Sequence, residues 1–429
     1  MRIAMVDPYF AVGLGYQPTG WFNAFVAQGH HVRAFCSCYT STVARHLYDR
    51  PFEEGLAKVN GGEMLRMRVR LLPRDMVYCS GVLPKVLEFD PDLILATYPG
   101  TIFALPVIRN HARFRGLMVS AFGENSAQRH TSMRGAKEFL RNLMLDAAFF
   151  TIKRHFYCAA MEGSDVILLQ TPDTFTHLLP RVAWGRRRQR IAERCVLSPL
   201  GFETAVFYVD EDERRAERAR LGVADEEVLA LYACKIMPEK RLDIWVELMA
   251  AAMRRVPRLR AMLIGFKEGD ARCEQVRKWM DATGLRDRFI CAAFAKREHL
   301  RGLANAADFG VWHLQPAVTI QEVMGTGLYM VLTDSSTVSH LVADPVTGRY
   351  FRHKDFAQAE ELVVQTAEAF MEKGAITAVA ARKRRAEINA GLFSYETMAA
   401  KLVAAAADPK HALERMRFTP ARMQEHLSA

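Results

Sequence analysis

Two lysines five residues apart, Lys235 and Lys240, lie across the junction between a predicted strand and a predicted helix. The strand is the apolar run 228–234, and the helix covers 241–256. At the carboxyl end of a buried strand both ammonium groups can reach one diphosphate, and charge-assisted hydrogen bonds to phosphate are strong. The alternative is a pair of solvated surface lysines. Because Lys235 follows an apolar strand directly, we expect a diphosphate clamp.

A second stretch, residues 311–334, is predicted to form a further part of the ligand-binding site. The run 309–314 is apolar with a Trp, as expected of a buried parallel strand, and Pro316 prevents further ladder pairing. Residues 319–324 suit a short helix ended by glycines, and 329–333 is a second buried strand. A loop that leaves a strand and enters a helix presents backbone N–H groups and a positive dipole end. Anionic, hydroxyl-rich ligands bind in such a place.

Glu322 is the one carboxylate inside that short predicted helix. It could accept two hydrogen bonds from a ribose diol, as acidic residues do in dinucleotide sites. It also stands three residues after Thr319, which is the spacing of a capping box. Both interpretations stay open. The backbone of Gln315, Val318 and Thr319 would offer donors to the same ligand.

The amino-terminal part reads as a strand, a glycine-containing turn, a helix and a strand over 2–37. This opening suits a doubly wound sheet. The turn contains Gly13 and Gly15, which indicate either a nucleotide contact or only a flexible turn. Glu124 follows a predicted strand at 116–123 and would project into an interdomain cleft, unless this is an ordinary glycine turn.

Strand-like and helical runs alternate twice along the chain, which predicts an α/β protein with two parallel doubly wound sheets. We expect an amino-terminal domain over 1–205, a second domain over 206–390, and a helical tail over 391–429 that packs back on the first. The basic, apolar-rich run 134–162 is either a core helix or a membrane-facing amphipathic helix. The arginine-rich run 185–190 is interpreted as a solvated loop that could contact lipid headgroups.

The composition and charge of the chain favour some classes of binding partner over others. The chain has 429 residues and a net charge of +10, which favours an anionic partner such as a nucleotide or a membrane surface. We find no nucleic-acid-binding motif, no apolar run of membrane-spanning length and no signal peptide. The eight cysteines are dispersed, which fits reduced thiols in a cytoplasmic protein and argues against a metal site.

Several segments, in order, resemble the retaining nucleotide-sugar glycosyltransferases of family 4. Gly29-His-His-Val32 is similar to that family's Gly-His-Glu-Val, and Pro199-Leu-Gly-Phe-Glu-Thr-Ala-Val-Phe207 to its Pro-Asn-Gly-Val-Asp-Thr-x-x-Phe segment. Glu322-Val-Met-Gly-Thr-Gly327 looks like its Glu-Ala-Met-Ala-x-Gly. Further matches follow in family order: Leu263-Ile-Gly265, Phe294, Leu300 and Ala307-Asp308.

The resemblance implies a GT-B architecture of two facing Rossmann-like domains and transfer of a sugar, with retention, from a nucleoside-diphosphate sugar. It places Lys235 and Lys240 at the donor diphosphate, Glu322 at the ribose and Gly265 in the donor site. The acceptor would be a saccharide, lipid-linked or small-molecule hydroxyl in cell-surface polysaccharide or glycoconjugate synthesis. No metal or separate cofactor is expected, and Glu124 is a candidate for orienting donor or acceptor. The enzyme would be cytoplasmic or peripheral at the inner face of the membrane.

The chain departs from the family pattern at two places. Leu314 stands where the family has a donor-sugar Glu, and Phe122-Gly-Glu124 stands where it has a His. These departures keep two alternatives open, a non-catalytic sugar-nucleotide-binding subunit and a sugar-nucleotide epimerase of GT-B type.

Overall fold

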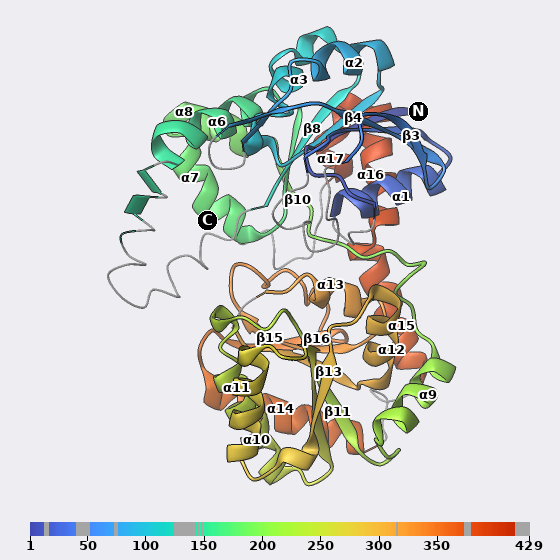
Figure 1. The fold of residues 1–429 in the computed structure, drawn as a ribbon, viewed down its shortest axis with the longest axis vertical. Helices are drawn as coiled ribbons and strands as arrows, with labels where there is room; N and C mark the ends of the chain where they lie inside the picture. The colour runs from blue at the N-terminus through green and yellow to red at the C-terminus, as the bar shows by residue number, and fades with distance from the viewer. Residues whose placement is uncertain are drawn as a thin grey trace. The chain divides into compact units, whose positions relative to one another are not determined.

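The computed structural model describes residues 1–12, 17–39, 52–72, 76–123, 140, 143–144, 146–147, 149–314, 316–372 and 379–416. These residues form two compact units, each built around its own sheet (Figure 1). Unit 1 contains Met1–Leu200 and the described residues from Tyr395 onward, and unit 2 contains Gly201–Ser394. The boundaries predicted from the sequence, at 205 and 390, lie close to these divisions.

Unit 1 is built on an eight-stranded sheet in the order β10-β9-β8-β7-β1-β2-β4-β3. All neighbours pair in parallel except β3, which runs antiparallel to β4 at the edge. The central strands are buried along their whole length, as apolar runs covered on both faces should be. The strands are β1 (Arg2–Val6), β2 (His31–Ser37), β3 (Gly55–Val59), β4 (Gly62–Met67), β7 (Leu93–Thr97), β8 (Leu117–Phe122), β9 (Val166–Leu169) and β10 (Cys195–Leu197), with a separate hairpin of β5 (Arg70–Leu72) and β6 (Met76–Tyr78).

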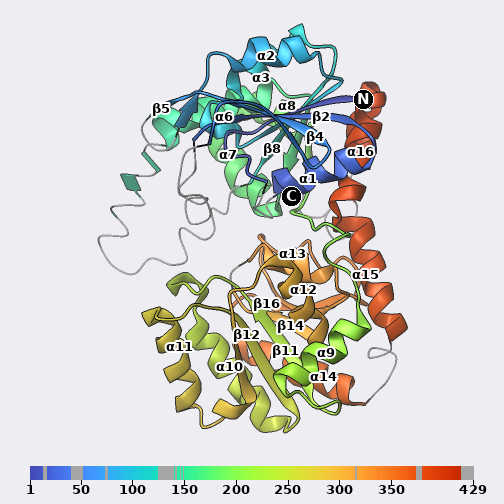
Figure 2. The same cartoon turned by 45° about the vertical axis from the view of Figure 1, so that its right-hand side comes forward.

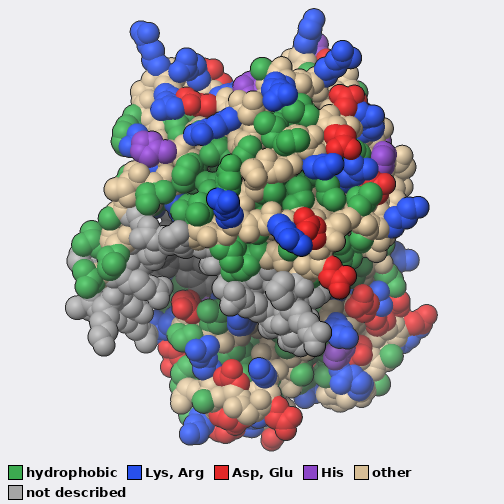
Figure 3. Space-filling model, turned by 45° about the horizontal axis from the view of Figure 1, so that its top comes forward, with side chains coloured by type: hydrophobic (Ala, Val, Ile, Leu, Met, Phe, Trp, Pro, Cys, Tyr) green, Lys and Arg blue, Asp and Glu red, His purple; other side chains and the backbone are tan. Residues whose placement is uncertain are grey.

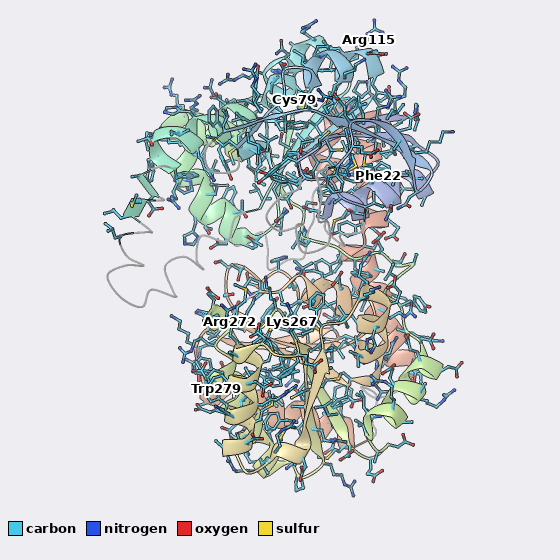
Figure 4. All side chains as sticks on the ribbon, in the orientation of Figure 1. Phe22, Cys79, Arg115, Lys267, Arg272 and Trp279 are labelled. Atoms are coloured by element: carbon cyan, nitrogen blue, oxygen red, sulfur yellow. The ribbon has the colours of Figure 1, made fainter. Side chains whose placement is uncertain are left out.

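Helices flank this sheet, and their apolar side chains fill the space against it. Phe22 on α1, labelled in Figure 4, is fully buried and lies 5.1 Å from the ring of Phe10, centroid to centroid. The helical segments are α1 (Gln17–Ala27), α2 (Val82–Phe89), η1 (Pro99–Thr101), α3 (Leu105–Arg109), η2 (His111–Arg113), η3 (Phe149–Lys153), α6 (Arg154–Glu162), η4 (Thr174–Leu178), α7 (Leu179–Val182), α8 (Gly185–Ala192), α16 (Tyr395–Ala407), η7 (Pro409–His411) and α17 (Ala412–Met416).

Unit 2 has a six-stranded, wholly parallel sheet in the order β13-β12-β11-β14-β15-β16. Its strands are β11 (Val228–Ala233), β12 (Leu259–Phe266), β13 (Phe289–Ala293), β14 (Phe309–Trp312), β15 (Tyr329–Asp334) and β16 (Gly348–Arg352). Its helical segments are α9 (Glu211–Leu221), η5 (Pro238–Lys240), α10 (Leu242–Arg255), α11 (Ala271–Ala282), η6 (Arg286–Arg288), α12 (Arg297–Ala306), α13 (Thr319–Met324), α14 (Phe356–Met371) and α15 (Val379–Phe393).

The last described helices return to unit 1. Helix α16 lies beside α1 in both ribbon views (Figures 1 and 2). The ring of Tyr395 covers Gly20, where an added Cβ would lie 2.1 Å from the ring. Just before this return, the backbone N–H of Phe202 donates to the carbonyl of Phe393 at 3.2 Å, within unit 2.

Some elements differ from those predicted from the sequence. The run 185–190 belongs to helix α8, so its interpretation as a loop was wrong. Arginine is a good helix former, and this favours the helix. The predicted helix over 101–114 is broken into short turns around α3. Of the predicted helix over 134–162, residues 149–162 are helical in η3 and α6, and residues 134–139, 141–142, 145 and 148 lie outside the described residues. Within the described ranges no helix is both long and apolar enough to cross a membrane.

Candidate functional site

The strand order of unit 2 reverses between β11 and β14. After β11 the chain adds β12 on one side, whereas β14 is followed by β15 on the other. Ligands of open parallel sheets bind outside the carboxyl ends of the strands at such a switch point. Two loops meet this condition, 234–241 after β11 and 313–318 after β14. They contain Lys235 and Lys240, and lead to Glu322.

Hydrogen bonds tie the two strand ends together. The carbonyl of Ala233, the last residue of β11, accepts from Trp312 Nε1 at 3.3 Å and from Thr319 Oγ1 at 2.7 Å. Lys240 Nζ donates to the carbonyl of Pro316. The loop between β14 and α13 is therefore held against the end of β11 from two directions.

A further bond fixes the turn that carries Lys240. His313 is fully buried, and its Nε2 lies 3.0 Å from the carbonyl oxygen of Arg241. Burial lowers the pKa of His313 to about 4, so the ring is neutral near pH 7 and donates from Nε2. Arg241 itself has a positive φ of 45° and binds Asp243 at 2.7 Å between Nη2 and Oδ2.

The two lysines differ in their surroundings. Lys235 is exposed, and its ammonium makes no hydrogen bond or ion pair with the described part of the chain. Lys240 is half-buried and engaged with Pro316, and its desolvation lowers its pKa. Lys235 is thus the more solvent-exposed of the two lysines, and Lys240 also holds the loop 313–318 in place.

Gly265 lies against the end of β11. Its φ is +127°, and an added Cβ would lie 1.9 Å from the carbonyl oxygen of Cys234, immediately before Lys235. The pairing of β12 with β13 shifts register around this residue. Only glycine fits this backbone conformation and this close approach. Lys267 and Arg272, labelled in Figure 4, follow at the carboxyl end of β12 and in α11.

Glu322 does not form the capping box. The N-cap of α13 is Val318, with no side-chain cap bond, and the Thr319 hydroxyl donates to Ala233 instead. The Glu322 side chain lies 3.3 Å from Arg297, measured from Oε1 to Nε. Arg297 Nη1 also donates to Glu203. The capping interpretation of Glu322 is therefore wrong, because its partner comes from another helix.

Burial governs the protonation of Glu322. Only 7% of the residue is exposed, and desolvation raises the pKa of its carboxyl from 4.5 to about 7. Arg297 opposes this shift, and Glu203 adds to it. A carboxylate with such a perturbed pKa at the edge of a switch point is a candidate binding group.

The carboxyl end of α13 is anchored from α15. Asn389 donates to the carbonyl of Met324 at 2.9 Å, and Arg385 donates to that of Gly327 at 2.7 Å. An added Cβ at Gly325 would lie 2.7 Å from the Phe202 ring. The predicted helix over 319–324 and its glycine stop are confirmed.

Unit 1 has a switch point of its own, between β1 and β7. Asp7 follows β1 and is fully buried, and its carboxyl accepts from Thr97 Oγ1 at 2.5 Å and from the Tyr9 N–H at 2.6 Å. Burial raises the pKa of Asp7 to about 6. Tyr98 and Ile102 flank η1 with positive φ of 48° and 65°, a strained conformation that concentrates at functional sites.

Three of the residues predicted from the sequence, Gly15, Glu124 and Gln315, lie outside the described residues. Sequence reasoning missed Arg297 and His313 as site residues. Glu203 lies inside the Pro199–Phe207 segment quoted for the resemblance, at the position of the family's Asp. That acidic position was the one available signal for the Arg297 contact.

No family model matches the chain. Over 166 residues it is 29% identical to the alpha-D-kanosaminyltransferase of Streptomyces kanamyceticus, a stretch that covers 37% of this chain and 42% of that protein. The chain thus spans less than half the length of this curated relative.

Solved structures match nearly the whole chain. Sucrose-phosphate synthase from Thermosynechococcus elongatus aligns with a TM-score of 0.64 at 16% identity, covering 96% of this chain and 99% of that one. HepE from Anabaena in complex with UDP gives 0.63 at 14% identity, covering 95% and 100%. WaaG, a glycosyltransferase involved in lipopolysaccharide biosynthesis, gives 0.53 at 14% identity, covering 96% and 99%.

The fold is GT-B. The predicted fold class, two Rossmann-like units with parallel sheets and a helical carboxyl-terminal region, is confirmed.

Proposed function

We propose that this protein is a glycosyltransferase that moves a sugar from a nucleoside-diphosphate sugar to an acceptor hydroxyl. The observation that carries the proposal is the switch point of unit 2, where Lys235, Lys240 and the buried Glu322 follow two adjacent strands. The kanosaminyltransferase relative and the GT-B fold support the same class of reaction. HepE binds UDP, which fits a nucleotide donor here.

In this proposal the chain's own residues bind and polarise the donor. Lys235 and Lys240 interact with the diphosphate and stabilise the negative charge that develops on it as it leaves. Glu322 accepts hydrogen bonds from the ribose, and the backbone around Gln315, Val318 and Thr319 donates to the sugar. Gly265 lets β12 approach the Cys234–Lys235 turn. The anomeric configuration is retained, and no metal is required.

The acceptor belongs, in this proposal, to unit 1. Its switch point carries the buried Asp7 and the strained Tyr98. From the sequence alone, Glu124 is proposed to orient donor or acceptor, and Gly15 to contact the nucleotide. The proposed acceptor is a saccharide, lipid-linked or small-molecule hydroxyl, in the synthesis of a cell-surface polysaccharide or glycoconjugate.

We also propose that unit 1 binds an anionic membrane surface. Large apolar side chains are exposed beside basic ones, and Figure 3 shows hydrophobic atoms among Lys and Arg on one face of this unit. Arg154 lies 3.5 Å from the centre of the Trp184 ring, and Arg181 lies 5.3 Å from that of Phe150. Arg188 and Arg190 on α8 are exposed as well. Apolar groups with surrounding arginines are typical of interfacial binding.

A panel of nucleoside diphosphates and their sugars tests the main proposal. A bound donor at about a hundredfold its Kd should stabilise the protein by about 2.7 kcal/mol. Release of nucleoside diphosphate, faster when a suitable acceptor is present, should follow for the same donor. If no nucleotide raises the melting temperature, the proposal is wrong.

Leu314 favours a second candidate. It stands where the resembling family has a donor-sugar Glu, as expected of a subunit that binds a sugar nucleotide without turning it over. Tight donor binding without release of diphosphate would support that subunit. A sugar-nucleotide epimerase would instead convert the donor with no acceptor present.

A further inference from the structure

Three charged side chains from separate parts of unit 2 form one row. Glu203 lies in the segment after β10, Arg297 is the first residue of α12, and Glu322 lies in α13. Arg297 contacts both carboxylates, Glu203 through Nη1 and Glu322 through Nε. The side chains of the two glutamates are each 9% exposed, and that of Arg297 is 25% exposed.

The row has more negative than positive charge. A buried carboxylate is costly unless a cation or hydrogen-bond donors compensate for the lost hydration. Here one guanidinium lies between two carboxylates, so Glu322 is attracted by Arg297 and repelled by Glu203 behind it. Arg297 therefore favours the charged form of Glu322, against the burial that raises the pKa of this carboxyl.

The contact also leaves one oxygen of Glu322 open. Oε1 accepts from Arg297, whereas Oε2 accepts no hydrogen bond from the part of the chain that the structure describes. A carboxylate fixed through one oxygen can accept from a ligand with the other. The helix that carries it begins beside the donor-side loop 313–318.

Packing of the segment 202–207 holds Glu203 in place. The centre of the Phe207 ring lies 5.4 Å from Arg297 Cζ. At Gly325 an added Cβ would lie 2.7 Å from the Phe202 ring and 2.8 Å from Phe207 Cβ, so the segment lies directly against the end of α13. The same segment thus supports the end of α13 and delivers the carboxylate that orients Arg297.

We propose that Arg297, oriented by Glu203, is a positioning residue that keeps the Glu322 carboxylate charged and turned to accept the donor's ribose hydroxyls through Oε2. This inference rests on the proposed function, because it concerns how the nucleotide is held. Arg297 acts through Glu322, and no contact of Arg297 with the donor is needed.

Among the residues that the structure describes, few charged groups act on Glu322. Helix α13 packs against α12 and α15. From α12 comes Arg297, with Glu203 behind it, and these are the charges that act on Glu322. From α15, Arg382 and Arg385 donate to the carbonyls of Thr326 and Gly327 and are bound to backbone.

Removing the positive charge of Arg297 and removing the negative charge of Glu203 give opposite predictions for the charge state of Glu322. The test measures the affinity for a nucleoside diphosphate as a function of pH, from about pH 5.5 to 9. In the wild type the affinity should rise with pH with a midpoint near the Glu322 pKa of about 7. Arg297→Gln should move this midpoint up and reduce the affinity at pH 7 about tenfold, with recovery at higher pH. Glu203→Gln should lower the pH midpoint of the affinity. The midpoint of Arg297→Lys should lie close to that of the wild type.

Arg301→Gln is the matched control. Arg301 lies one turn further along α12 and binds Glu213 in the same manner, at 2.9 Å and 3.0 Å, with its side chain 17% exposed. The Arg301→Gln variant should leave the pH midpoint of the nucleoside diphosphate affinity unchanged. An Arg297→Gln variant that loses affinity equally at every pH, or that keeps the wild-type midpoint, overturns the proposal.

The ligand-free protein separates this inference from the proposed function. A double-mutant cycle on unfolding, with Arg297→Gln and Glu322→Gln singly and together at pH 8, should show coupling between the two side chains. Without that coupling the positioning role is wrong, even if the nucleotide binds. If the coupling is present but the wild type binds no nucleoside diphosphate, the proposed function fails and so does the role of Oε2.

Discussion

The ammonium of Lys240 donates a hydrogen bond to the carbonyl of Pro316, a residue 76 positions further along the chain. This bond joins the loop after β11 to the loop after β14 at the switch point of the sheet. Lys240 therefore has two tasks if the proposed function holds, to bind the diphosphate and to place the loop that leads to α13. Lys235, which is exposed, has only the first.

The two lysines should differ when each is replaced by alanine. Lys235→Ala should weaken nucleoside diphosphate binding about ten- to a hundredfold, the value of one charge-assisted hydrogen bond, and leave the melting temperature unchanged. Lys240→Ala should weaken binding at least as much and also lower the melting temperature, because the Pro316 contact is lost. Calorimetric titration and thermal unfolding measure both effects.

The bare nucleoside is the control ligand for these variants, since it lacks the phosphates and should bind each of them nearly as well as the wild type. The double variant should lose less than the sum of the single losses if both ammonium groups act on one diphosphate. Wild-type diphosphate affinity in both single variants would contradict the clamp.

Gly265 offers a test of backbone geometry. Gly265→Ala should lower the free energy of unfolding by about 3 kcal/mol, because its φ of +127° is unfavourable for alanine and the new Cβ meets the Cys234 carbonyl. Gly284→Ala is the matched control, since its φ is +72° but nothing lies within 4 Å of the added Cβ. It should cost only about 1 kcal/mol. Equal losses in denaturant unfolding would show that the close approach to Cys234 is relieved without cost.

The buried Glu322 should impose a pH dependence on stability. Its pKa is raised in the folded state to about 7 from 4.5, so the folded protein holds this proton more tightly than the unfolded chain does. The Glu322 contribution therefore favours folding most below about pH 4.5 and is lost progressively as the pH rises towards about 7. Unfolding free energies of wild type and Glu322→Gln, compared from pH 5 to 8, measure it. A difference that does not change with pH would contradict the burial argument.

Membrane binding is tested with vesicles that contain anionic lipid. The protein should bind them at low ionic strength, and the binding should fade as salt screens the arginines. The double variant Arg188→Gln with Arg190→Gln should bind several-fold more weakly. The matched control, Arg352→Gln with Arg384→Gln, removes two exposed arginines from unit 2 and should have no effect. Equal losses in both double variants would indicate a response to net charge alone.

The sequence predicted the sheets best where strands are continuously apolar. Strands β11, β12 and β15 are buried runs flanked by helices with apolar periodicity. Their continuous apolar pattern and short length therefore predict buried strands. It did not reveal β3 or β5, whose residues are largely exposed, or the short edge strand β16. Such strands are set by pairing with their neighbours, and a one-dimensional pattern does not contain that pairing.

For the candidate site, local spacing gave the lysines and Glu322 but not their partners. The Thr319–Glu322 spacing suggested a local cap, yet the Thr319 hydroxyl is used by Ala233 and the carboxylate by Arg297. Both contacts join residues far apart in the chain, and no pattern within a helix predicts them. Such long-range contacts determine the role of Glu322, because the local sequence pattern alone predicts that its side chain caps the helix.

Tyr395 fills the space over Gly20 and lies 6.5 Å from the ring of Trp21, although the whole of unit 2 separates these residues in the chain. During synthesis from the amino terminus, α1 emerges long before the residues that cover it. The described residues of unit 2 all lie between Gly201 and Ser394, so this stretch can fold once it is free of the ribosome. Unit 1 can fold completely only after the residues from Tyr395 onward have been synthesised. The unit whose synthesis begins first is therefore the last to be completed.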